Sequence, residues 1–161
     1  MLYVECYADF ALVRCLGVSK REITHAFGKS RVCKRLKKTS NSKGLIDEDP
    51  SKHQPPYLKK FQIREDLSLF KIRILFDSTR NNSVIVLCPR LEEWVLNAAK
   101  EANLDMAKYR LPNDPEKLHE ILSSASRSEN NEIKKFQKLV QDLKEKSPMM
   151  NCLKKLLTEL P

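Results

Sequence analysis

Acidic residues end two short apolar runs near the start of this chain, and a glycine–lysine pair ends a third run between them. Glu5 follows the first run, with Asp9 four residues later, Gly28–Lys29 follows the second, and Asp47 and Asp49 follow the last. Carboxylates that lie close together repel one another unless a hard cation such as Mg²⁺ neutralises them. The pattern therefore predicts a divalent-cation site, with Mg²⁺ or Mn²⁺ as the cofactor.

Strand geometry indicates which of these acids can act together. Asp47 and Asp49 are two residues apart, so in an extended strand their side chains point to one side and Glu48 points to the other. The carboxyl ends of neighbouring parallel strands meet at one edge of a sheet, where α/β proteins usually bind ligands. If the strand before Glu5 lies beside the strand before Asp47, three carboxylates can reach one or two cations. Taken alone, the Asp-x-Asp triplet is also typical of a solvated turn before Pro50.

Extended and helical patterns alternate along the first half of the chain. This alternation predicts an α/β fold with a mostly parallel, Rossmann-like sheet flanked by helices. Apolar residues recur at helical spacing over 8–16 and 32–36, and β-rich runs after Pro56 predict a β-hairpin extension with its turn at 81–83. The expected strands are Met1–Glu5, Glu22–Phe27, Gly44–Asp47, Phe61–Ile63, Phe70–Phe76 and Val84–Leu87.

The final third of the chain is predicted to be helical. A helix is expected over Leu91–Ala102, and Asp114-Pro115-Glu116 combines an N-cap, a proline at the first helical position and an acid in the first turn. Apolar stripes follow within 118–122, 133–143 and 153–160. We therefore predict a metal-binding α/β core over 1–105 and a helical extension packed on it over 106–161. Packing on a coiled-coil partner helix is the alternative for these short stripes.

Composition excludes several classes of protein. The 161 residues are 41% hydrophobic and 32% charged, which is typical of a globular protein. No apolar run approaches the roughly 18 residues of a membrane helix, so we expect a cytoplasmic protein without a membrane partner. The five cysteines are scattered without a C-x-x-C pair, which argues against a zinc site or a disulfide framework. The three histidines show no zinc-hydrolase spacing, and motifs for acyl transfer, nucleotide hydrolysis and dinucleotide binding are missing.

The positive charge is concentrated in the half that holds the acidic pattern. The first 60 residues contain 13 Lys or Arg and 6 Asp or Glu, whereas the remaining 101 contain 17 and 15. Cations beside a metal site suit a polyanionic substrate such as nucleic acid, although a lysine-rich surface without a ligand gives the same balance. The predicted nucleic-acid-binding residues lie on one helix face and are Arg31, Lys34, Arg35, Lys37 and Lys38.

The order of these motifs resembles the TOPRIM domain, the metal-binding module of topoisomerases, bacterial-type primases and the overcoming-lysogenisation-defect nucleases. The resemblance covers about residues 1–50 and is closest to small stand-alone or nuclease-type members. Its specific elements are Val4-Glu5 and Ile46-Asp47-x-Asp49, with Gly28-Lys29 between them. It implies a TOPRIM-like fold and metal-dependent phosphoryl transfer on DNA or RNA, in which one or two cations activate water and stabilise the leaving oxygen.

The resemblance also implies roles for individual residues. Glu5 is the general acid/base or a metal ligand, Asp47 and Asp49 bind Mg²⁺, and Asp9 matches a further acid of nuclease-type members. Lys29 is expected near the phosphate as a catalytic point charge, with a solvated first-turn lysine as its alternative. The chain departs from the family at Cys6, where glycine is common, and a side chain there can narrow the site or alter its backbone. Nuclease-type relatives often work with a separate ATPase or in defence against phage, so an ATPase is a further partner implied, and a homo-oligomer partner is also expected.

Several alternatives remain open from the sequence. Glu92 and Glu93 open a helix, where one of them can approach the metal or both can be ordinary first-turn acids. His25 near the second strand can touch substrate or be structural. The leading function is a Mg²⁺-dependent nuclease. The alternatives are a catalytically silent module that binds nucleic acid or a partner protein, and an enzyme acting on a small phosphorylated metabolite.

Overall fold

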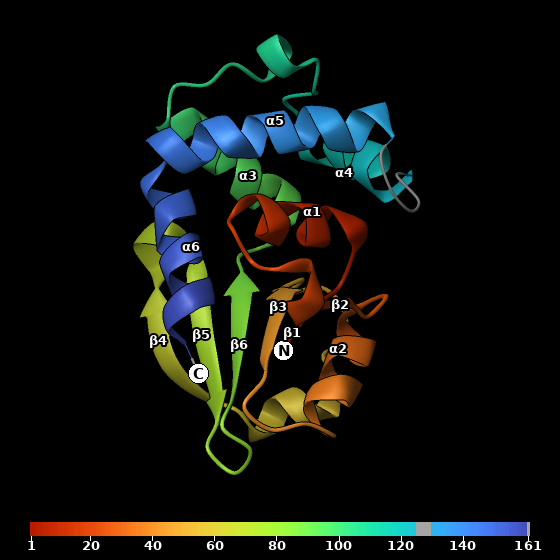
Figure 1. Cartoon of the computed structure of the whole chain (residues 1–161), viewed down its shortest axis with the longest axis vertical. Helices are drawn as coiled ribbons and strands as arrows, with labels where there is room; N and C mark the ends of the chain where they lie inside the picture. The colour runs from red at the N-terminus through yellow and green to blue at the C-terminus, as the bar shows by residue number, and fades with distance from the viewer. Residues whose placement is uncertain (125–129, 161) are drawn as a thin grey trace.

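The computed structural model shows an α/β fold in which helices flank a six-stranded sheet (Figure 1), and it describes residues 1–124 and 130–160. The strands are β1 Leu2–Val4, β2 Ile23–His25, β3 Lys43–Asp47, β4 Gln62–Leu67, β5 Ile72–Asp77 and β6 Asn82–Leu87. The helices are α1 Tyr7–Cys15, α2 Lys29–Leu36, α3 Leu91–Glu101, α4 Pro115–Ser124, α5 Asn131–Lys146 and α6 Pro148–Glu159.

The sheet is mixed, with the strand order β2-β1-β3-β6-β5-β4. The pairings of β1 with β2, β1 with β3, and β3 with β6 are parallel, whereas β5 is antiparallel to both β6 and β4. The predicted α/β class is therefore confirmed, and the strands before Glu5 and Asp47, whose adjacency the sequence leaves open, are neighbours. The predicted hairpin is part of a three-stranded antiparallel unit, β4-β5-β6, which completes the sheet.

The antiparallel unit differs from its prediction in length. Strand β4 extends to Leu67 through polar residues, because pairing with β5 fixes its backbone although its side chains face water. Its register shifts at a bulge between Ile63 and Glu65. Strand β5 begins only at Ile72, since Ser68–Phe70 forms a 3₁₀ turn that ends at Lys71, whose φ is 52°. Sequence patterning does not show these backbone irregularities.

Alternating side chains place an apolar layer on each face of the sheet. Leu2, Val4 and Leu45 belong to the larger core cluster, with α1 and α3–α6, whereas Tyr3 and Ile46 belong to the smaller one, with α2 and the 3₁₀ turn Pro56–Lys60. Figure 1 shows α5 lying across α1 and α4, and α6 running beside the β4–β5 half of the sheet. The two layers therefore hold both ends of the parallel strands in fixed positions.

The predicted helical final third is confirmed for the residues that the structure describes. Phe136 in α5 and Leu153 in α6 are fully buried in the same cluster as Trp94 of α3. The predicted extension 106–161 includes 125–129 and 161, which lie outside the described residues. In the described part of the chain, no helix combines the length and apolar character that crossing a membrane requires.

Candidate functional site

The carboxyl ends of β1 and β3 bring Glu5 and Asp47 into direct contact. Parallel pairing sets Val4 beside Leu45, and the Asp47 backbone N–H donates a hydrogen bond of 2.8 Å to Oε1 of Glu5. The Asp47 carboxylate in turn accepts a 2.8 Å hydrogen bond at Oδ1 from the N–H of Leu91, the first residue of α3. Glu5 and Asp47 therefore connect two strands to the N-terminus of a helix.

Asp9 lies within this acidic group but is first of all a helix-capping residue. Its Oδ2 accepts a 2.9 Å hydrogen bond from the Cys6 N–H, and its own N–H donates to Cys6 Sγ at 3.3 Å. This capping box begins α1. Cys6 has an extended backbone with φ −132°, which any residue adopts. A cysteine at this position therefore leaves the local backbone unstrained.

Burial and mutual repulsion raise the pKa values of these carboxyls. Burial first of all, and then the charge of the nearby Asp9 carboxylate, raise the pKa of Glu5 from 4.5 to about 7. The pKa of Asp47 is raised by burial and then by Asp9, Glu5, Glu92 and Asp49. Burial also raises the pKa of Asp9, as does the charge of Glu92. These carboxyls are therefore close enough to oppose one another's ionisation in the cation-free protein.

Glu92 belongs to the cluster, whereas Glu93 does not. The Glu92 side chain is buried, and Oε1 lies 2.9 Å from Nδ1 of His119. Its Oε2 has no hydrogen-bond partner among the described residues, although Arg90 Nε lies 3.8 Å away. Glu93 instead accepts a 2.7 Å hydrogen bond from Arg90. Of the two alternatives open from the sequence, the structure favours Glu92 as an additional member of the acidic site.

Asp49 lies beyond the end of β3 and is paired with cations. Its φ is 44°, so the strand alternation that relates it to Asp47 in the prediction stops at Asp47. Its carboxylate lies 3.7 Å from Lys29 Nζ and 3.2 Å from Lys52 Nζ. Glu48 forms an ion pair of 3.1 Å with Arg73. Asp49 therefore has a different environment from Asp47, although both follow the same strand.

Lys29 is buried, so the alternative of a solvated first-turn lysine is wrong, and the predicted phosphate contact stays a prediction. Its ammonium donates hydrogen bonds to the backbone oxygen of Glu48 at 2.9 Å and to Oε1 of Gln54 at 3.3 Å. Together with the Asp49 ion pair, these contacts hold the loop 48–54 against the start of α2. The amphipathic pattern around Lys29 gives no signal for this burial, because the partners are a backbone carbonyl and a distant glutamine.

The predicted basic face of α2 is exposed. Val32, Cys33 and Leu36 face the core, while the cationic side chains on the other face are solvent-accessible. The exposed cations of α2 are Arg31, Lys34 and Arg35, whereas the exposed Lys37 and Lys38 follow the end of the helix at Leu36 and do not lie on its face as predicted. The helix begins beside the acidic group, since the N–H of Gly28 donates to the backbone oxygen of Glu5 at 2.8 Å. Cations that can hold phosphates thus lie on the helix that adjoins Glu5.

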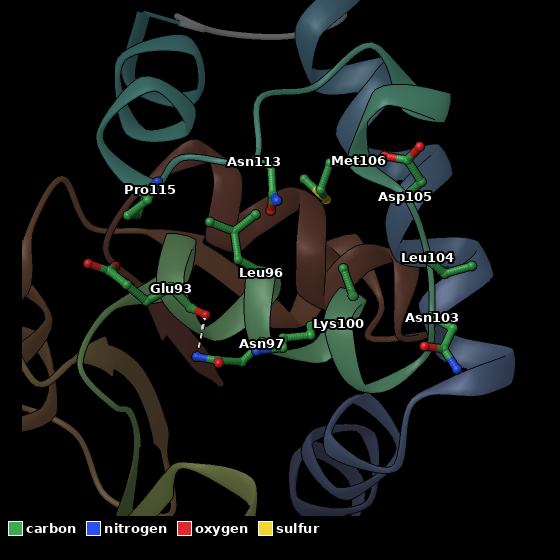
Figure 2. Close-up of a pocket in the computed structure, with 11 residues that line it drawn as sticks. Glu93, Leu96, Asn97, Lys100, Asn103, Leu104, Asp105, Met106, Asn113 and Pro115 are labelled. Atoms are coloured by element: carbon green, nitrogen blue, oxygen red, sulfur yellow. Dashed lines mark hydrogen bonds between the residues drawn. The ribbon is translucent and has the colours of Figure 1, made fainter.

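Two cavities lie near the site. One of about 390 Å³ adjoins Asp47 and is also lined by Gln54, Lys59 and Arg73. A second, of about 680 Å³, lies between α3 and the segment 103–115 (Figure 2). Its polar lining includes Glu93, whose backbone oxygen accepts a hydrogen bond from the Asn97 side chain. The second cavity is lined by none of the predicted site residues, and of the acidic cluster only Asp47 lines the first.

In residues 1–124 and 130–160, no group of three or more His, Cys, Asp or Glu side chains is arranged to hold a metal ion. Oxygens of Glu5, Asp9 and Asp47 are turned toward backbone N–H groups instead. Comparisons of the chain with models of protein families, with curated proteins and with solved structures gave no match.

Proposed function

We propose that this protein is a divalent-cation-dependent phosphoryl-transfer enzyme, most simply a nuclease that acts on DNA or RNA. The observation that carries the proposal is the acidic cluster of Glu5, Asp9, Asp47 and Glu92 at the ends of β1 and β3 and the start of α3. Burial and repulsion raise the pKa values of Glu5 and Asp47. A cluster of this kind gains stability from a cation that neutralises it.

The chemistry of the donors fits Mg²⁺ or Mn²⁺. Every candidate ligand is a carboxylate oxygen, the type that hard divalent cations prefer, and the buried Oε2 of Glu92 lacks a hydrogen-bond partner among the described residues. Among the described residues these side chains are not arranged to hold a metal ion. Glu5, Asp47 and Glu92 would hold the ion only after Glu5 and Asp47 turn from the backbone N–H groups that they contact here, with Asp9 supporting them. When bound, such an ion would lower the pKa of an attacking water and stabilise charge on the phosphate.

The chain's own groups supply the remaining requirements. Burial and the Asp9 carboxylate raise the pKa of Glu5 to about 7 in the cation-free protein, so Glu5 can act as a general acid/base only where Asp47 and Glu92 hold the ion without it. Lys29 has its ammonium occupied by Glu48 and Gln54, so we assign it a positioning role for the loop 48–54 in place of the predicted phosphate contact. The exposed cations of α2 would neutralise substrate phosphates. The resemblance to nuclease-type TOPRIM domains supports the same assignment.

The test is metal-dependent cleavage of labelled single- and double-stranded DNA and RNA, with Mg²⁺ or Mn²⁺ and then with EDTA. Asp47→Asn should abolish cleavage while keeping the fold, since an amide oxygen can still accept from Leu91 N–H. Asp66→Asn is the matched control, because Asp66 is exposed on β4. The proposal is wrong if no metal-dependent cleavage occurs, or if Asp47→Asn cleaves as the wild type does.

A second candidate is a catalytically silent module that binds nucleic acid. The observation that favours it is the pairing of Asp49 with Lys29 and Lys52, which neutralises one expected metal ligand internally. In that case, binding should weaken with salt, persist in EDTA and occur without turnover. Cleavage by the purified protein that is lost with Asp47→Asn would exclude this candidate.

A further inference from the structure

Four aromatic rings form a row that leads from α1 to the surface beside Glu5. The rings of Tyr7 and Phe10 stack with centroids 5.6 Å apart, and Tyr7 meets His25 edge to face at 6.0 Å. His25 then stacks on Phe27 at 4.0 Å with an angle of 30° between the rings. The row therefore becomes more exposed toward Phe27, the ring at its outer end.

Phe27 is directed outward by its backbone. Its side chain is 57% exposed, and its backbone φ of 62° is one that residues other than glycine rarely adopt. On either side, Ala26 N–H donates to the Val4 oxygen and Gly28 N–H to the Glu5 oxygen, both at 2.8 Å. These bonds fix the Phe27 loop against the end of β1. An exposed aromatic ring in this conformation adds little to the core.

Cationic and polar groups surround this ring. The Arg31 guanidinium lies over the Phe27 ring, 5.9 Å from its centroid, at the outer limit of a cation–π contact, and the Arg31 side chain is exposed. Ser30 and Lys34 are also exposed on α2. An apolar protein partner would require a broader apolar surface, and lysine is depleted in protein–protein interfaces. A flat group that carries phosphates suits the surroundings better.

We propose that Phe27, supported by His25, is a stacking platform for an unpaired base of single-stranded nucleic acid, with Arg31 and Lys34 contacting the adjoining phosphates. Stacking requires an exposed base face, which a paired and stacked duplex does not offer. The inference rests on the proposed function for its substrate class and extends it by naming single strands as the substrate. Because Gly28 is bonded to Glu5, a base on Phe27 lies next to the acidic cluster.

The test measures binding by fluorescence anisotropy in EDTA, where no turnover occurs, with a labelled oligothymidine and a labelled duplex. Phe27→Ala should weaken single-strand binding by about tenfold, the size expected for losing one base–aromatic stack, with a much smaller effect on the duplex. Phe27→Trp should bind normally, and its fluorescence should be quenched by the single strand. Leu69→Ala is the matched control, because Leu69 is 84% exposed and follows β4 at the opposite edge of the sheet.

Three results would overturn the proposal. In the first, Phe27→Ala binds single strands as the wild type does. In the second, Phe27→Ala lowers the affinity for the single strand and for the duplex equally. In the third, Phe27→Trp fails to bind single strands normally. The first of these leaves the exposed ring to a protein partner. Cleavage and binding are read separately, so the two proposals can fail separately. If the protein cleaves nucleic acid and Phe27→Ala binds single strands as the wild type does, the stacking platform alone is refuted. If single-strand binding depends on Phe27 and no cleavage occurs, the proposed reaction alone is refuted.

Discussion

Replacement of Glu5 by glutamine should stabilise the cation-free protein at alkaline pH. The glutamine side chain keeps an oxygen that can accept from the Asp47 N–H, which donates to Glu5 at 2.8 Å, and the replacement removes one negative charge from the cluster. The gain in stability from Glu5→Gln should depend on pH, because the wild type carries the unfavourable Glu5 charge only at a pH where Glu5 is ionised. This dependence distinguishes relief of repulsion from a simple change in packing.

The size of the effect follows from the pKa of Glu5. The rise from 4.5 to about 7 is equivalent to about 3 kcal/mol, at about 1.4 kcal/mol for each pH unit. Because the folded protein binds the proton more tightly than the unfolded chain, this stability is present below pH 4.5 and is lost as the pH rises through about 7. About 1 kcal/mol is lost by pH 5 and nearly all by pH 8, so the gain from Glu5→Gln should be about 2 kcal/mol larger at pH 8.

Thermal unfolding in EDTA at pH 5 and pH 8 measures this difference. For a chain of this length, about 2 kcal/mol corresponds to a difference of roughly 4–8 °C in the change of Tm. Glu120→Gln is the matched control, because Glu120 is exposed on α4 and its substitution should change the Tm equally at pH 5 and at pH 8. An equal change for Glu5→Gln at pH 5 and pH 8 would show that repulsion within the cluster is not a significant term in stability.

Further predictions concern the cation, a buried acid, a cap and the core. At pH 8, Mg²⁺ at a hundred times Kd should raise the unfolding free energy of the wild type by about 2.7 kcal/mol, seen as a higher Tm, and should leave the Tm of Asp47→Asn nearly unchanged; equal Tm shifts would exclude the cation site. Tyr57→Phe should lower the unfolding free energy, measured by urea denaturation, by about 1–3 kcal/mol, because the Tyr57 hydroxyl donates a hydrogen bond of 2.6 Å to the buried Asp77 carboxylate; an unchanged value would show that this hydrogen bond contributes nothing. Cys6→Ser should be more stable than Cys6→Ala by about 1 kcal/mol in the same assay, because the hydroxyl is the better N-cap; the reverse order would contradict the capping role. Phe136→Ala, which truncates a fully buried ring, should cost about 3–5 kcal/mol in one cooperative transition; two separate transitions would contradict a core shared by α5 and the sheet.

Sequence patterning predicts much of this fold because the apolar alternation in the strands and the helical stripes after Pro115 are strong local signals. The adjacency of Glu5 and Asp47 is only a condition of the predicted site, because strand order is not fixed by local patterns, and the parallel pairing of β1 with β3 meets that condition. The place of Glu92 could not be predicted, because it depends on how α3 docks through the hydrogen bond between Leu91 and Asp47. Sequence spacing carries no information on such a long-range contact.

The burial of Lys29 and the environment of Asp49 show a second limit. Both depend on the loop 48–54, where Asp49 takes a φ of 44° and Gln54 reaches the Lys29 ammonium. From local preferences alone, the Asp49 side chain is expected to point to the same side of the strand as that of Asp47. The turn after β3 ends this alternation. The function of the site and the TOPRIM resemblance remain predictions, which cleavage and binding experiments can decide.

The outer strand β4 has a consequence for association between copies of the chain. An edge strand presents unpaired backbone groups to which another chain can add, which is a common route to aggregation. Here the bulge between Ile63 and Glu65 interrupts the edge, and Arg64 and Asp66 are charged and exposed beside it. Growth of the sheet beyond β4 is therefore disfavoured, so Ile63, which is 64% exposed, can face water without promoting edge-to-edge association.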